Sequence, residues 1–111
     1  KIVEWGVYNL VQAYTGDQKD DAEFLKQISP IHNISTSYPP VLISGGNKDF
    51  LTDTQSLPFV EALKAHNIAV TEVFYPESKA WLIHEYQFFM GKKESQQTFI
   101  RTLDFLHQHS L

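Results

Sequence analysis

The chain of 111 residues contains no cysteine, which excludes a disulfide framework and any metal site built on thiolates. It has no excess of basic residues either: 9 Lys and Arg stand against 13 Asp and Glu, giving a formal net charge of −4. Proteins that bind nucleic acid usually carry a basic patch or stripe. We therefore do not expect nucleic acid as a partner.

Long hydrophobic runs are also absent. No apolar stretch approaches the roughly 18 residues that a membrane helix needs, and the residues after Lys1 show no signal-peptide pattern. We expect no membrane span and a cytoplasmic location, the latter only if Lys1 lies near the natural start. The chain has no repeat, low-complexity tract or Gly/Ser linker, so we expect one structural unit, residues 1–111.

Residues 1–28 show helical spacing and predict a helical cap or connecting region. Apolar residues recur at three- and four-residue steps in the first segment, at Val3, Val7, Leu10, Val11 and Tyr14. The sequence Thr15-Gly16-Asp17 should end this helix. A second short helix is predicted over residues 22–27, because the Ser29-Pro30 pair that follows disfavours helical backbone.

Residues 29–111 predict the order strand, helix, strand, helix. The run Val41-Leu42-Ile43 is typical of a parallel strand that is buried on both faces. Thr52 and Gln55 have capping-box spacing and predict a helix to about His66. Residues 69–75 are rich in β-branched side chains and predict a second strand. A final covering helix is predicted over residues 94–109, with an apolar stripe formed by Phe99, Ile100, Leu103 and Leu106.

Two strands joined by one helix form a βαβ crossover, in which the strands are parallel. This pattern predicts an α/β fold with about two parallel strands and flanking helices. Ligands of open α/β sheets bind beyond the carboxyl ends of the strands. Asp49 follows the first strand and His84 lies one loop beyond the second, so both should reach the same rim.

Three segments together resemble a known family: residues 39–53, which include Gly45-Gly46-Asn47-Lys48-Asp49, the pair Tyr75-Pro76, and residues 82–86 around His84. They are similar to the C-terminal part of an α/β-hydrolase, most closely the esterases and lipases related to hormone-sensitive lipase. The resemblance covers residues 29–111 well and residues 1–28 loosely. It implies that Asp49 is a catalytic acid and His84 a catalytic base, with no metal and no cofactor.

A hydrolase of this kind also needs a nucleophile. Its serine lies in a Gly-x-Ser-x-Gly elbow, where an imidazole accepts the hydroxyl proton and a carboxylate orients the imidazole. No serine of this chain has glycine both two residues before and two residues after it. In these hydrolases the nucleophile precedes the acid and the histidine. We therefore expect a C-terminal fragment, inactive alone, of a parent protein that hydrolyses small carboxylic esters.

Each candidate residue also has a structural interpretation. Asp49 suits a loop aspartate that accepts backbone hydrogen bonds, and His84, among large apolar neighbours, suits a packing residue. Asp53 suits the start of a helix better than catalysis. His107 and His109, two residues apart on a helix, face different directions and do not form a metal pair.

The sequence departs from the family pattern beside the histidine. Relatives commonly carry a small glycine-containing stretch before this histidine and Gly-Phe after it, whereas here Trp81 lies three residues before it and Glu85-Tyr86 follow. An adjacent carboxylate can raise a histidine pKa or obstruct an acyl site. A parent protein could therefore be slow, narrow in specificity or inactive.

Two other functions are compatible with these residues. The first is a noncatalytic interaction module in which the acid and the histidine are vestigial and a sheet edge binds a partner. The second is a serine peptidase of the prolyl-oligopeptidase type, which has a similar triad order. Because two strands form a marginal sheet, we also expect a homo-oligomer or association with the missing N-terminal half.

Overall fold

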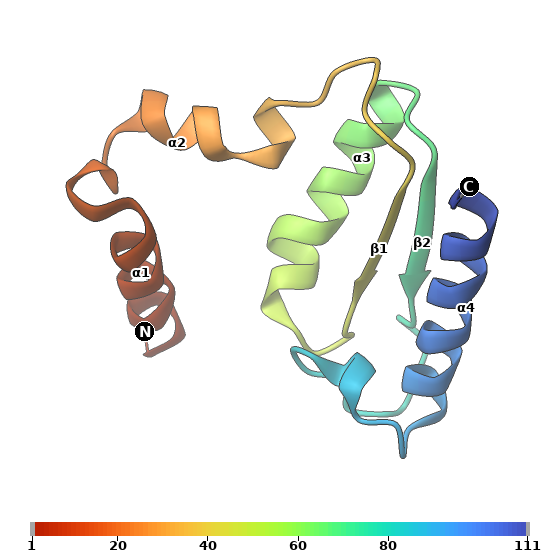
Figure 1. The fold of residues 1–111 in the computed structure, drawn as a ribbon. Coiled ribbons are helices and arrows are strands. Elements are labelled where there is room, and N and C mark those ends of the chain that lie inside the picture. Colours follow the sequence, from red (N-terminus) through yellow and green to blue (C-terminus); the bar gives the residue numbers. More distant parts are fainter. Residues whose placement is uncertain (1, 111) are drawn as a thin grey trace. The chain divides into compact units, whose positions relative to one another are not determined.

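The computed structural model describes the backbone of residues 2–110 and the side chains from Tyr8 to Ser110. The chain divides into two compact units, Lys1–Ile34 and Ser35–Leu111 (Figure 1). The sequence favoured one unit with an internal change after residue 28. No helix in the part of the chain that the structure describes is long and apolar enough to cross a membrane.

The first unit contains the two helices that the sequence predicts, α1 (Ile2–Thr15) and α2 (Ala22–Ile28). Gly16, with φ of +60°, follows α1 in a left-handed conformation that glycine adopts without steric cost. The carboxylate of Asp21 caps α2 by accepting hydrogen bonds from the N–H groups of Glu23 and Phe24.

This unit extends beyond α2 because Asn33 ties the next turn back to the helix end. Its side-chain amide donates to three backbone carbonyls, those of Lys26, Gln27 and Ser29. These carbonyls lie at or just after the last turn of the helix, where backbone acceptors lack helical partners. The boundary therefore falls after Ile34, six residues later than the change expected from the sequence.

The second unit contains two parallel strands in its described part, β1 (Val41–Gly45) and β2 (Val70–Phe74). Their register pairs Val41 with Val70 and Gly45 with Phe74. The helix α3 (Leu57–Ala65) connects them, and α4 (Lys93–His109) follows β2. The order of elements and the mixed α/β class with a parallel strand pair agree with the sequence prediction.

The helical segment after β1 begins differently from the prediction. Thr52 does not form a capping box; its hydroxyl donates to the carbonyl of Gly46 at 2.9 Å. Residues Thr52–Ser56 form a wide π-helical turn that leads into α3. Pro58 is the second residue of α3 and directly follows this π-helical turn, so it lies inside a continuous helical segment that begins at Phe50.

The strand pair lies between α3 and α4 (Figure 1). Six apolar side chains of this unit are buried, and they come from α3, β2 and the segments that follow these elements: Val60, Leu63, Ile68, Val73, Leu82 and Tyr86. Burial of a large aliphatic side chain stabilises a fold by about 1.5–3 kcal/mol. The core thus fixes the crossover and the loop on which His84 lies.

The prediction that β1 is buried on both faces is wrong for the described chain. Val41, Leu42 and Ile43 are only half-buried. One edge of β1 pairs with β2, and no described strand pairs with the other edge. The apolar run is that of an interior strand, but here the strand lies at an edge.

The predicted orientation of the last helix is also wrong. Its bounds match the prediction, yet the apolar stripe of Phe99, Ile100, Leu103 and Leu106 is 50–56% exposed. The buried face of α4 carries the small polar residues Ser95 and Thr98 instead. Their hydroxyls bond to the backbone of Tyr86 and to the side chains of Tyr75 and Tyr86, and these bonds account for their burial.

Candidate active site

The site begins at the glycine pair that ends β1. Gly46 approaches the backbone of the loop after β2, and a Cβ at this position would overlap with the carbonyl of Leu82. The same carbonyl accepts a hydrogen bond from the N–H of Lys48 at 2.9 Å. Glycine at position 46 therefore lets the two loops that follow the strands meet directly.

Asn47 joins these loops a second time. Its side chain donates to the carbonyl of Ser78 at 2.8 Å and accepts from the N–H of Leu82 at 3.2 Å. Both polar atoms of one amide thus bind the loop after β2, 31 and 35 residues further along the chain. This bridge fixes the loop of Asp49 relative to the loop of His84.

Both the backbone and the side chain of Asp49 form hydrogen bonds that fix its position. Its N–H donates to the carbonyl of Gly46 at 3.2 Å, and its Oδ1 accepts from the N–H of Leu51 at 3.0 Å. Its side chain is only 9% exposed. A buried carboxylate needs such partners, because an unpaired charge is costly away from water.

His84 uses the remaining oxygen of this carboxylate. Its Nδ1 lies 2.9 Å from Oδ2 of Asp49. An ionised carboxylate can only accept, so Nδ1 carries the proton and Nε2 of the neutral ring holds a free lone pair. The imidazole is 66% exposed, and no described residue hydrogen-bonds to Nε2. This is the tautomer that a general base requires.

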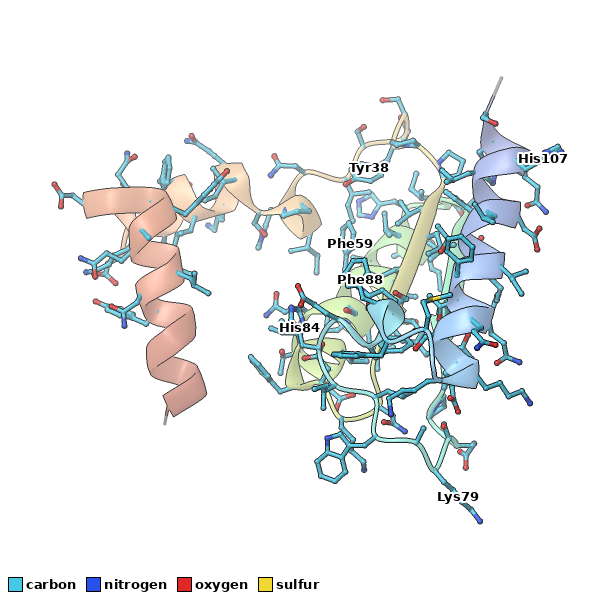
Figure 2. All side chains as sticks on the ribbon, turned by 60° about the horizontal axis from the view of Figure 1, so that its bottom comes forward. Tyr38, Phe59, Lys79, His84, Phe88 and His107 are labelled. Carbon is cyan, nitrogen blue, oxygen red and sulfur yellow. The ribbon has the colours of Figure 1, made fainter. Side chains whose placement is uncertain are left out.

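A pocket of about 250 Å³ lies beside this pair, at the loop end that is turned forward in Figure 2. Asp49 and His84 both line it, together with the neighbour Glu85. Gln55 and Ser56, from the segment that leads into α3, line another part of its wall. The pocket therefore joins both loops and the start of the crossover helix.

Hydrogen bonds between hydroxyl-bearing residues connect the segment after His84 to α4. The Tyr86 hydroxyl lies 2.9 Å from Oγ1 of Thr98, and the Tyr75 hydroxyl lies 3.2 Å from the same atom. Ser95 donates to the backbone carbonyl of Tyr86 at 2.7 Å. Burial raises the pKa of Tyr86 above its usual range, although the bond to Thr98 acts in the opposite direction. The phenol therefore stays protonated at neutral pH.

The other residues considered from the sequence lie outside this site. Asp53 belongs to the wide turn before α3 and lines a separate pocket of about 220 Å³ with Asn47 and Tyr75. His107 and His109 both lie in the last turn of α4, and the ring of His109 contacts that of Phe105 at 4.6 Å. The described residues contain no His, Cys, Asp and Glu cluster able to hold a metal.

His32 and His66 lie at the ends of a short helical turn and of α3, respectively. The ring of His32 pairs with Ser29, and that of His66 pairs with the carbonyl of Ala62. Sequence reasoning missed Asn47, Gln55 and Ser56. Asn47 lies between a glycine pair and a candidate acid, Gln55 has only its capping-box spacing with Thr52, and Ser56 has no signal of its own.

The second unit is thus a mixed α/β structure with a carboxylate–imidazole pair beyond the carboxyl ends of two parallel strands. Comparison of the chain with protein-family models, with curated proteins and with solved structures gives no match.

Proposed function

We propose that this chain supplies the acid and the base of a serine carboxylic-ester hydrolase whose nucleophile lies in a preceding segment of a longer parent protein. One observation carries the proposal: Asp49 Oδ2 lies 2.9 Å from His84 Nδ1, and His84 Nε2 has no partner among the described residues. The two residues are 35 positions apart, so the fold brings them together. The resemblance of residues 39–53 and 82–86 to α/β-hydrolases supports the same function.

The proposed chemistry assigns one step to each residue. His84 Nε2 accepts the proton of a serine hydroxyl as the serine oxygen bonds to the ester carbonyl carbon. The carboxylate of Asp49 holds the ring and stabilises the imidazolium that forms. His84 then returns this proton to the leaving alcohol, and water releases the acyl group in a second cycle.

Two exposed apolar features support a longer parent protein. Leu42 and its neighbours in β1 form an edge strand with the sequence of an interior strand. The side chains of the apolar stripe on α4 are about half exposed to solvent. A preceding part of a hydrolase sheet would pair with the β1 edge and cover apolar surface. A second copy of the chain could do the same, and we include a homo-oligomer in the proposal.

The activity test uses both the chain and the parent protein. The 111-residue chain should not hydrolyse short acyl aryl esters above a buffer control, because it lacks an elbow serine. In the parent, His84→Ala should remove nearly all turnover, and Asp49→Asn should reduce kcat by about 10⁴-fold because it favours the wrong tautomer.

His107→Ala is the matched control, since this histidine lies on α4 outside the pocket; it should leave the rate unchanged. Equal losses from the His84 and His107 substitutions would contradict the triad. Aryl esters and prolyl amides should be compared in the same assay, because preferential amide cleavage would identify a peptidase of the prolyl-oligopeptidase type.

A noncatalytic interaction module is the second candidate, and the exposed stripe on α4 favours it. In that case the stripe binds a partner and the Asp49–His84 pair only stabilises the loops. The sequence encoded before Lys1 discriminates the two functions. A Gly-x-Ser-x-Gly elbow there supports hydrolysis, whereas its absence supports the module.

A further inference from the structure

Glu85 has an unusual backbone beside the proposed base. Its φ of 60° and ψ of 20° place it in the left-handed region, directly before the short turn Tyr86–Phe88. In the described part of the chain, only Asn67 shares a positive φ among residues other than glycine. Asparagine tolerates this region, but for most other residues it costs on the order of 1–3 kcal/mol. Glycine would avoid that cost.

Glu85 also lines the same pocket as Asp49 and His84, and it is exposed. No described residue forms a hydrogen bond or an ion pair with its carboxylate, whereas Asp49 is already bonded to His84 and to Leu51. Among the described residues that line the pocket there is no Lys or Arg. Glu85 therefore contributes a negative charge that the pocket does not neutralise.

We propose that Glu85 selects substrates that carry a cationic group, such as an ammonium, near the ester bond. This inference rests on the proposed function for the hydrolytic step, but cation binding itself needs no nucleophile. Glu85 is exposed, so its carboxylate acts as a surface charge that attracts a cation and repels an anion, and salt weakens both effects. The left-handed backbone of Glu85 lies directly after His84 in the chain.

Binding of small probes to the 111-residue chain tests the selection directly. The probes are choline, its uncharged isostere 3,3-dimethyl-1-butanol, and 3,3-dimethylbutyrate as the anion, followed through the ring resonances of His84. Choline should bind about fivefold more tightly than the neutral isostere, the size expected of a partly exposed ion pair. The anion should bind least, and added salt should reduce the preference.

Glu85→Gln keeps the size of the side chain and should abolish the preference for choline. Glu77→Gln is the matched control, because it removes one exposed carboxylate outside the pocket and should leave the preference intact. Equal binding of choline and its neutral isostere, or equal effects of the two substitutions, would overturn the inference.

The parent protein separates this inference from the proposed function. Turnover that is equal for cationic and neutral esters of the same acyl group would reject the selectivity and keep the hydrolase. Choline binding that depends on Glu85, in a parent without any esterase activity, would keep the cation site and reject the proposed hydrolysis.

Discussion

Asp49 uses its two carboxylate oxygens for different elements. Oδ1 accepts from the N–H of Leu51 at the start of the following helical segment, and Oδ2 contacts His84. The structural and the catalytic interpretations of this residue are therefore compatible. The helix bond fixes the carboxylate, and the fixed carboxylate orients the imidazole.

Asn47 is the residue on which this orientation should depend most. Asn47→Ala removes two hydrogen bonds between the loops, so we expect a loss of about 1–3 kcal/mol in the free energy of unfolding. The Nδ1–H proton resonance of His84 should broaden or disappear, because the imidazole is no longer held against Asp49. Urea unfolding and proton NMR measure the two effects.

Gln96→Ala provides the matched control for this substitution. It also removes a side-chain amide bonded to a backbone carbonyl, that of Met90, but on α4 and outside the pocket. This variant should keep the His84 resonance unchanged. An Asn47 variant whose His84 resonance matches that of the unmodified chain would show that other contacts position the ring.

At the scale of elements, most of the fold could be predicted because it depends on local signals. Helical spacing over residues 2–14, proline before β1 and β-branched residues in β2 are all readable from sequence. The two errors concern the surroundings of β1 and α4: β1 has no described partner strand at one edge, and α4 buries a different face from the one expected. These surroundings depend on elements packed against them, and the 111 residues provide no described strand for the free edge of β1.

The candidate site was predictable for a related reason. Asp49 and His84 each follow a strand, and parallel strands bring their carboxyl ends together. The bridge through Asn47 and the strained Glu85 were not predictable, because they depend on the exact approach of two loops. Neither hydrogen-bond partners 31 residues apart nor a left-handed glutamate leaves a periodic pattern in the sequence.

Tyr86, which links the loop of His84 to α4, should make the free energy of unfolding depend on pH under alkaline conditions. Burial raises the pKa of Tyr86 in the folded state, so above about pH 10 the unfolded chain loses this proton first. Folding then becomes less favourable as the pH rises, by at most about 1.4 kcal/mol per pH unit from this group. Below that pH both states keep the proton and the contribution is constant.

Urea unfolding from pH 8 to pH 11 measures this dependence. Tyr86→Phe should reduce the loss in free energy of unfolding at alkaline pH. Tyr14→Phe removes a phenol that is 82% exposed and should leave that loss unchanged. An identical alkaline loss in the Tyr86 variant and the unmodified chain would show that another group causes it.

At the scale of the whole molecule, β1 and β2 each pair with only one described strand, so each has an open edge. The edge strand β1 has the more apolar sequence of the two. The N–H of Val41 donates to Ala69, on the side of β2. Since peptide groups alternate in direction along a strand, the backbone groups of Leu42 and Ser44 point to the free edge. Unpaired strand edges with apolar side chains favour association with another chain.

We therefore expect the isolated chain to form a homodimer or a larger assembly, with the β1 edge at or near the contact. Leu42→Lys places a charge on this half-buried edge strand and should abolish assembly, which sedimentation at micromolar concentration measures. Circular dichroism establishes whether the variant stays folded. Leu10→Lys is the comparison, because Leu10 lies on α1 and is 71% exposed. Loss of assembly in the Leu10 variant alone would indicate exchange of α1 between copies, and a well-folded monomer of the unmodified chain would contradict assembly altogether.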